Sequence, residues 1–321
     1  MTETFNVAID LGGSGARVSI VGSGRRRSLT GAGWDPEAGA FGHLQALVGA
    51  AASTTTSPGP VRLMVAAGLT GLNGVVPPID DLGELLFKRF GVESLRIADD
   101  SLTSALGATA GTAGVVLAIG TGVVALGLGP DGEVARVDGG GAFIGDRGSG
   151  WWIGRQGLIA AVSALEHRSG GSDRLLSAAV ERYGSITSLP QALREVPNPF
   201  REIARFSDDV ASAALAGDRE AISIFARAGD HLATAAAAAA LQTNQRDGVP
   251  VYLLGGVSKS SALFAPEMFE ALRRLGVDAA AQQPRGDALN GAEALLGEIQ
   301  LTTDLLSVWS HGRRMAIHDR H

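Results

Sequence analysis

The residues best suited to chemistry lie between Gly139 and Gly154, in the segment GGGAFIGDRGSGWWIG. Seven of its sixteen residues are glycine, and they surround one acid, Asp146, and one base, Arg147. Glycine lets the backbone approach a ligand closely and adopt positive φ. A loop that is only structural rarely needs so much glycine. The segment therefore predicts a binding site for a small polar molecule.

A first glycine-rich turn, Gly12-Gly13-Ser14-Gly15, connects two runs typical of strands, 5–10 and 16–21. A dinucleotide-binding motif needs a helix directly after its glycines, and a β-branched run follows here instead. A Walker loop is excluded because no Gly-Lys-Ser/Thr occurs. Two interpretations remain: a plain hairpin turn, or a hairpin whose backbone N–H groups bind phosphate. Asp10 favours the second, because a carboxylate just before the turn can hold a hydrated Mg²⁺.

A second turn of the same kind, Gly120-Thr121-Gly122, separates the apolar runs 115–119 and 123–128. Its order of apolar strand, glycine turn and apolar strand repeats that of the first turn, which indicates a duplicated unit. Taken alone, it is more typical of a structural turn. If it faced the first turn across a cleft, it would bind phosphates from the opposite side.

Two adjacent acids, Asp99 and Asp100, lie where a predicted strand (95–98) meets a helix that we expect to continue to about residue 110. An N-cap of that helix and a general base that accepts a proton from a sugar hydroxyl both fit this position. Because neighbouring carboxylates repel each other, one pKa tends to rise.

A glycine pair, Gly255-Gly256, follows the predicted strand 251–254 and precedes Val257 and Ser258. Such a pair lets the backbone lie against an adenine or a ribose. The alternative is an ordinary turn between a strand and a helix.

Composition limits the class of protein. The chain has 321 residues, 45% of them hydrophobic, which suits one large domain or two of ordinary size. A net charge of −6 argues against nucleic acid as a partner, and we interpret Arg25-Arg26-Arg27 as an exposed turn. The absence of cysteine excludes disulfides, iron–sulfur clusters and thiolate zinc sites. The histidines show no spacing typical of metal ligands.

Localisation follows from what the sequence lacks. No apolar run reaches the roughly 18 residues that span a bilayer, and the first residues lack the pattern of a signal peptide. We therefore expect a cytoplasmic protein with no membrane partner. The sequence does not fix the oligomeric state, and a homodimer is among the states that it allows.

The remaining elements are predicted from periodicity and turn residues. They are a strand at 61–66, helices at 80–90, 261–275 and 287–299, a largely helical stretch at 151–241, and a loosely held tail after Leu301.

Together these motifs resemble the sugar-kinase, heat-shock-ATPase and actin superfamily, in matching order from about residue 5 to residue 300. Within it, the chain most resembles the N-acetylglucosamine kinase and BadF-type ATPase group. The long glycine-rich loop is similar to the group's GGWG…LGDEGSGYWIG signature, which is highly specific. The shorter motifs are the phosphate-1 turn Asp10 to Arg17, the acid motif Ile97 to Asp100, the phosphate-2 turn Gly120 to Gly122 and the adenosine motif Leu254 to Val257.

The resemblance implies an α/β fold of the actin-like (ribonuclease H-like) type. Two duplicated lobes with a central cleft would hold ATP and substrate between them. We expect a first lobe of residues 1–112, joined by the C-terminal segment near 300–321, and a larger second lobe of residues 113–300.

The resemblance also implies roles for individual residues, with ATP and Mg²⁺ as cofactors. Asp100 would be the catalytic base, and Asp10 would lie nearest to Mg²⁺. ATP would contact Gly12, Gly13, Ser14, Arg17, Gly120, Thr121, Gly122, Gly255, Gly256 and Ser258. The sugar would contact Asp35, Gly71, Asp99, Asp138 and Asp146, and Asp146 would shape the sugar site.

Departures from the group's pattern suggest a substrate. Asp35, Asp99 and Asp138 stand where the group tends to have uncharged residues, and Arg147 stands where it usually has Glu. Added carboxylates would favour the ammonium of glucosamine over the neutral N-acetyl group through charge-assisted hydrogen bonds. We therefore expect a kinase that phosphorylates glucosamine to glucosamine 6-phosphate, with N-acetylglucosamine as the alternative substrate.

Other functional classes fit the sequence less well. BadF-type ATPases that activate a partner enzyme hold an iron–sulfur cluster through cysteines, and this chain has none. A sugar-responsive repressor would need a DNA-binding segment before the first strand. An actin-like filament would polymerise with ATP, which light scattering would detect.

Overall fold

The computed structural model describes residues 2–34, 39–55 and 59–312, and it divides into two compact units. Unit 1 contains the residues up to Thr112, Pro130–Val134 and the residues from Pro284 onward. Unit 2 contains Ala113–Gly129 and Ala135–Gln283. The chain returns to unit 1 at Pro284, earlier than the expected position near residue 300, because the helix that follows packs against a helix of unit 1.

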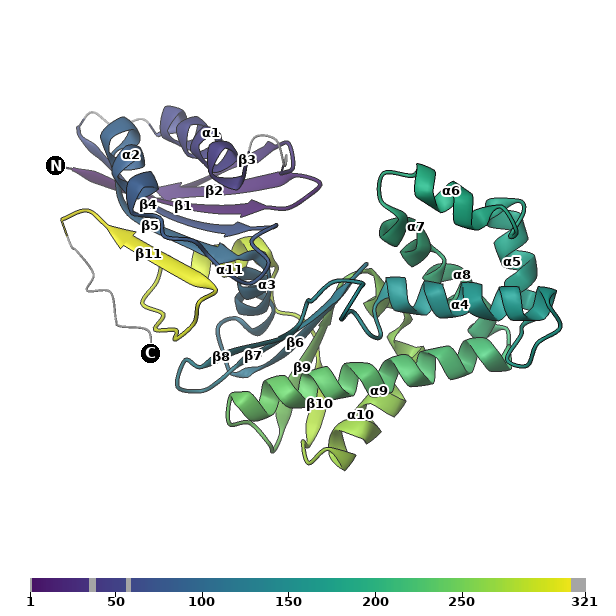
Figure 1. Ribbon diagram of the computed structural model, residues 1–321. Helices are drawn as coiled ribbons and strands as arrows, with labels where there is room; N and C mark the ends of the chain where they lie inside the picture. The colour runs from purple at the N-terminus through teal and green to yellow at the C-terminus, as the bar shows by residue number, and fades with distance from the viewer. Residues whose placement is uncertain (1, 35–38, 56–58, 313–321) are drawn as a thin grey trace. The chain divides into compact units, whose positions relative to one another are not determined.

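Unit 1 is built on a six-stranded sheet with the order β11-β5-β4-β1-β2-β3. The strands are β1 (Glu3–Leu11), β2 (Ala16–Gly22), β3 (Arg25–Gly31), β4 (Val61–Leu69), β5 (Val92–Asp99) and β11 (Leu306–Ser310). β1, β4 and β5 run parallel, and the other three are antiparallel to their neighbours. Helices α1 (Ala40–Thr54) and α2 (Asp80–Phe90) cover one face, and α3 (Asp100–Thr109) and α11 (Ala288–Ala294) cover the other (Figure 1).

Unit 2 is built on a five-stranded sheet with the order β10-β9-β6-β7-β8. The strands are β6 (Gly114–Ile119), β7 (Val123–Leu128), β8 (Val134–Asp138), β9 (Val249–Leu254) and β10 (Ala279–Gln282). The helices are α4 (Gly150–Leu165), α5 (Asp173–Tyr183), α6 (Leu189–Glu195), α7 (Pro199–Arg205), α8 (Ser207–Leu215), α9 (Arg219–Gln242), the 3₁₀ helix η1 (Gly256–Leu263) and α10 (Ala265–Arg274). The alanine-rich α9 packs against β6 and β7 and forms much of the core (Figure 1).

The two sheets repeat one topology. Leaving out the edge strand β11, the order β5-β4-β1-β2-β3 in unit 1 matches the order β10-β9-β6-β7-β8 in unit 2. In both sheets, the first strand in the sequence (β1 or β6) pairs antiparallel with the strand that follows it. Two strands that run parallel to this first strand lie on its other side. The predicted duplicated α/β fold is confirmed.

Close packing of α3 on α11 holds α3 in place. A Cβ atom on Gly107 of α3 would collide with the carbonyl oxygen of Asp287, and one on Gly291 of α11 would collide with that of Thr103. The two helices can approach this closely because both contact positions lack a side chain. Asp100, the first residue of α3, is therefore held on a rigid helix pair.

Two expectations for unit 1 were wrong. The triplet Arg25-Arg26-Arg27 is exposed, but it begins the edge strand β3 because the hairpin turn comes earlier, at Ser23 and Gly24. Arginines suit an edge strand, since charge there opposes pairing with another chain. Arg26 also forms an ion pair with Glu293 of α11.

The tail after Leu301 is not loosely held over its described part. β11 pairs antiparallel with β5, and Trp309 is only 6% exposed, lying where α2 has Gly83 in place of a side chain. The predicted helices 261–275 and 287–299 were also inexact. The first is a 3₁₀ helix followed by α10, and the second ends at Ala294. No helix in the described part of the chain combines the length and the apolar character that crossing a bilayer requires.

Candidate active site

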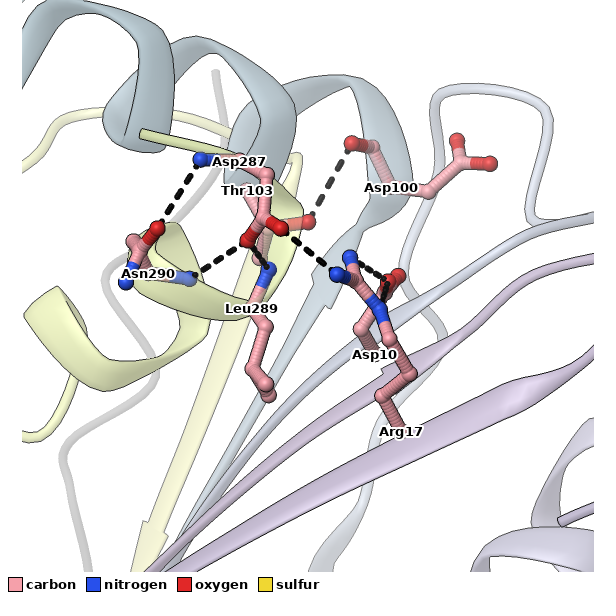
Figure 2. A network of polar contacts seen from close by, with 7 residues as sticks. All are labelled: Asp10, Arg17, Asp100, Thr103, Asp287, Leu289 and Asn290. Carbon is pink, nitrogen blue, oxygen red and sulfur yellow. Dashed lines mark hydrogen bonds and ion pairs between the residues drawn. The ribbon is translucent and has the colours of Figure 1, made fainter. Parts of the chain in front are cut away.

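Unit 1 places an ion pair at the first glycine turn. Asp10 on β1 lies directly opposite Arg17 on β2 in the antiparallel register. Nε and Nη2 of Arg17 donate to the same oxygen, Oδ2 of Asp10, over 3.1 and 2.6 Å (Figure 2). Oδ1 of Asp10 has no hydrogen-bond partner among the described residues. The turn between them is open, with Gly13 and Ser14 exposed and Gly12 N–H bonded to Gly15 O.

A second carboxylate, Asp287, completes this network, and sequence analysis missed it. Its Oδ2 accepts from Nη1 of Arg17 over 2.5 Å, while its Oδ1 accepts the backbone N–H groups of Leu289 and Asn290 (Figure 2). It is the N-cap of α11 in a capping box with Asn290. Desolvation raises the pKa of Asp287, but Arg17 and these N–H groups outweigh it and hold the pKa below its ordinary value. The capping-box spacing from Asp287 to Asn290 was the available sequence signal.

Asp100 is an acid of unit 1 whose pKa is raised. It is partly buried at the N-terminus of α3, and its carboxylate is drawn apart from the Arg17 ion pairs in Figure 2. Burial, followed by the charge of Asp99, raises the pKa of Asp100 to about 6, against hydrogen bonds from Thr70 and the Ser101 N–H that lower it. A carboxyl group with a pKa near 6 is ionised at neutral pH and still basic enough to accept a proton.

Asp99, predicted to bind substrate, serves as the helix N-cap. Its Oδ1 accepts from the N–H and hydroxyl of Ser101, and its Oδ2 accepts from the Gly74 N–H over 2.9 Å. The residue is 3% exposed. Gly71 has a φ of 83° and lies against the Trp34 indole, so it shapes the backbone here. Asp35 lies outside the described residues.

In unit 2, the second glycine turn is fixed by a helix. The N–H groups of Gly150 and Trp151, at the start of α4, donate to the carbonyl oxygens of Gly120 and Thr121 over 2.9 and 3.1 Å. The Gly120 N–H is bonded to the Gly122 carbonyl, and the Thr121 side chain is exposed. The predicted phosphate-2 turn is therefore a rigid hairpin, because a helix N-terminus supplies donors to its carbonyls.

Two acids connect the signature loop to this hairpin. Asp146, 7% exposed and with a φ of 60°, accepts the Val123 N–H through Oδ1 over 3.0 Å. A Cβ on Gly122 would lie 2.7 Å from that carboxylate, so only glycine fits there. Oδ1 of Asp138, at the end of β8, accepts the Asp146 N–H over 2.9 Å. Desolvation, with the Asp138 charge, raises the pKa of Asp146. Both acids position the loop.

A pocket of about 400 Å³ in unit 2 opens beside the hairpin. It extends from Gly120 and Thr121 to Gly256 and Val257, and the side of α7 and α8 closes it. Ser258, predicted to contact ATP, donates its hydroxyl to the Gly255 carbonyl over 2.7 Å. Its neighbour Lys259 lines the pocket, and no motif had pointed to it.

A second pocket, of about 320 Å³, lies over the hairpin and the signature loop. Thr121, Asp146 and Asn198 are its polar lining residues, and Phe143, Trp151 and Phe200 form its apolar side. The rings of Phe143 and Phe200 meet edge to face at 5.3 Å, although Phe143 is 88% exposed. Arg147 lines a different pocket, together with Asp138 and His231 of α9.

The residues of unit 1 fit a Mg²⁺ ion only as part of a nucleotide complex. The described residues contain no group of three or more acids, histidines or cysteines that could hold a metal. Asp10 offers one unpaired carboxylate oxygen, and Mg²⁺ commonly takes one or two carboxylates with phosphates and water as its other ligands. Asp10 would therefore hold Mg²⁺ as it arrives with ATP.

A comparison with models of known protein families identifies the family of this chain. The model of the BadF/BadG/BcrA/BcrD ATPase family matches residues 81–284, which is more than half of the chain. The chain belongs to the BadF/BadG/BcrA/BcrD ATPase family. A search of curated proteins found no match.

Solved structures show the fold of this ATPase family member in other proteins. One is a proposed N-acetylglucosamine kinase from Chromobacterium violaceum, with 26% identity, a TM-score of 0.66 and coverage of 91% of this chain and 99% of that one. Another is a proposed N-acetylglucosamine kinase from Porphyromonas gingivalis (17%, 0.58, 91% and 97%). A third is a ROK family glucokinase from Streptomyces griseus in complex with glucose and AMPPNP (18%, 0.51, 91% and 98%). The last two bear on fold alone.

Proposed function

We propose that this ATPase family member is an ATP-dependent kinase that phosphorylates a hydroxyl group of an amino sugar. The observation that carries the proposal is Asp100, a partly buried carboxylate on a rigid helix N-terminus whose pKa of about 6 suits a general base. The 26% identical neighbour, described as a proposed N-acetylglucosamine kinase, supports a sugar as the acceptor.

In the proposed reaction, the oxygen of the sugar hydroxyl bonds to the terminal phosphorus of ATP while Asp100 accepts the proton of that hydroxyl. The bond between this phosphorus and the oxygen of the departing ADP breaks. Bound Mg²⁺ would neutralise charge on the phosphates. Arg17, held by Asp10 and Asp287, brings one positive charge to the phosphate-1 turn, and Gly13 and Ser14 leave its tip accessible. In unit 2, the phosphate-2 turn would contact phosphate through Gly120, Thr121 and Gly122.

The sugar that we favour is N-acetylglucosamine, and the contacts of two acids are the reason. Our expectation of glucosamine depended on Asp35, Asp99 and Asp138. Asp99 is buried and accepts three hydrogen bonds from the protein, and Asp138 accepts one from the Asp146 backbone. Both carboxylates are thus engaged in hydrogen bonds within the protein, which weakens the argument that they select the ammonium group of glucosamine.

The aromatic pocket supports the acetylated sugar independently. Its walls of Phe143, Trp151 and Phe200 suit a methyl group, and Thr121 and Asp146 beside them suit the polar part of a sugar. Glucosamine would leave that apolar wall without a partner.

The test is a comparison of kcat/KM for N-acetylglucosamine, glucosamine, mannosamine and glucose. We expect N-acetylglucosamine to exceed glucosamine by about tenfold or more, the discrimination typical of a small apolar group. Phe200→Ala should reduce this ratio and leave kcat/KM for glucose nearly unchanged. A wild-type preference for glucosamine would reject the acetyl pocket and restore the charge argument.

A further inference from the structure

Two cations that line the pocket beside the phosphate-2 turn have no ion-pair partner among the described residues. Arg201 on α7 and Lys259 on η1 line it, and neither side chain has a hydrogen-bond or ion-pair partner among the described residues. A third cation, Arg205, is paired with Glu202 at 2.8 Å. The only acid lining the pocket within the described chain is Asp208.

The backbone fixes where these two cations lie. Gly255 has a φ of 90°, and a Cβ there would collide with the carbonyl oxygen of Ile119, so η1 begins directly against the end of β6. Lys259 follows within the first turns of η1, on the same pocket that Gly120 and Thr121 line. Arg201 approaches from the other wall, at the start of α7, where Asn198 caps its backbone N–H.

These positions suit a polyphosphate. A guanidinium binds phosphate oxygens in a fork, and an ammonium acts as a compact point charge. The pocket also includes Gly256 and Val257, where the adenosine motif was expected, and Gly120 and Thr121, the turn that was predicted to bind phosphate. Cations in a pocket that both motifs line are placed to meet the phosphates of a nucleotide.

We propose that Lys259 and Arg201 bind the phosphates of the nucleotide in this pocket, an inference that rests on the proposed function for the identity of the ligand. It adds two cationic side chains to the ATP contacts that the motifs had predicted in unit 2. It also gives the unpaired Lys259 a function, in place of the contact predicted for its neighbour Ser258.

The composition allows a direct test. The chain has two lysines, Lys88 and Lys259, both exposed. Adenosine diphosphopyridoxal carries an aldehyde near the position of the terminal phosphate, and borohydride fixes its adduct with a nearby amine. We expect mass spectrometry of wild-type protein to find the label on Lys259, with ATP protecting it. Lys88, on α2 of unit 1, is the internal control. Equal labelling of both lysines, or labelling that ATP does not reduce, would overturn the proposal.

Binding measured without sugar separates this proposal from the kinase proposal. By calorimetry, Lys259→Gln and Arg201→Gln should each raise the Kd for ATP about tenfold or more, because each removes a charge-assisted contact. They should change the Kd for adenosine little, and Lys88→Gln should change neither. If wild type binds no ATP, the proposed function fails. If wild type binds ATP and both variants bind it equally well, only the phosphate assignment fails. Equal weakening of ATP and adenosine would also overturn that assignment.

Discussion

The two glycine hairpins share a topology but differ in how charge is placed around them. In unit 1, the hairpin of β1 and β2 carries its own charges, Asp10 and Arg17, and a third, Asp287, joins them from α11. In unit 2, the hairpin of β6 and β7 is uncharged, and α4 and Asp146 hold its backbone through hydrogen bonds. Its neighbouring cations come from α7 and η1.

This difference suggests a division of labour between duplicated units. Unit 1 has acids of two kinds: Asp10 and Asp287 pair with Arg17, and Asp100 is a carboxylate suited to accept a proton. Unit 2 supplies the cations Arg201 and Lys259 beside its hairpin, which suit an anion. Duplication thus preserved the strand order, while different side chains gave each hairpin a different chemistry.

The largest effect should come from removing the proposed base of unit 1. Asp100→Asn keeps the size of the side chain but cannot accept the hydroxyl proton. We expect kcat to fall about 100- to 10,000-fold, the usual contribution of a positioned general base. ATP and sugar binding, measured by calorimetry, should change little. Turnover within threefold of wild type would remove Asp100 from that role.

Unfolding experiments on the same variant show whether a loss of activity comes from a loss of folded structure. Because the pKa of Asp100 is raised to about 6 in the folded protein, the folded state binds more protons than the unfolded state between about pH 4 and 6, and stability falls as pH rises through that window. Asp100→Asn should therefore be more stable than wild type at pH 8, by at most about 3 kcal/mol, and the gain should vanish toward pH 4. A variant less stable than wild type at pH 8 would contradict the buried-charge argument.

A pH profile sharpens the comparison next. Protonated Asp100 cannot act as a base, so kcat/KM should fall about tenfold per pH unit below about pH 6. Asp99→Asn keeps an N-cap oxygen for Ser101 but removes the charge that raises this pKa. The fall of kcat/KM at acidic pH should therefore begin at a lower pH in this variant than in the wild type. A fall that begins at the same pH would show that Asp99 does not influence the titrating group.

The smallest effect should come from the Arg17 network. Asp287→Asn keeps an oxygen for the α11 cap and loses the anion, and the exposed Arg17 pair should cost at most about 1 kcal/mol. Asp287→Ala also loses the cap, which should cost about 1 kcal/mol more. Urea unfolding measures both variants. Equal losses would mean that the cap contributes nothing, and the two functions of Asp287 would then have to be reassigned.

The sequence predicted features that depend on local order. Both hairpins, the helix start at Asp100 and the duplication follow from alternation, glycine turns and repeated spacing. Prediction from the sequence failed where the structure of a segment depends on pairing with another strand. β11 forms because β5, about two hundred residues earlier, offers an unpaired edge, and the arginine triplet becomes strand β3 by pairing with β2.

Side-chain partners add what the sequence could not show at the site. The Asp99 carboxylate caps α3, and the Ser258 hydroxyl donates to the Gly255 carbonyl. Lys259 belongs to no recognised motif. It lines the pocket because η1 begins directly against the end of β6, a contact that the sequence does not show. The sequence named candidate residues, but only the fold shows which partners their polar atoms contact.

The most direct measurement of the central claim is the ratio of sugar phosphate formed to ADP released by wild-type protein with Mg²⁺, ATP and N-acetylglucosamine. We predict a ratio near one, and negligible ADP release when the sugar is left out. ADP release that is independent of sugar, with no phosphorylated sugar in the products, would show an ATPase without this acceptor and would contradict the account.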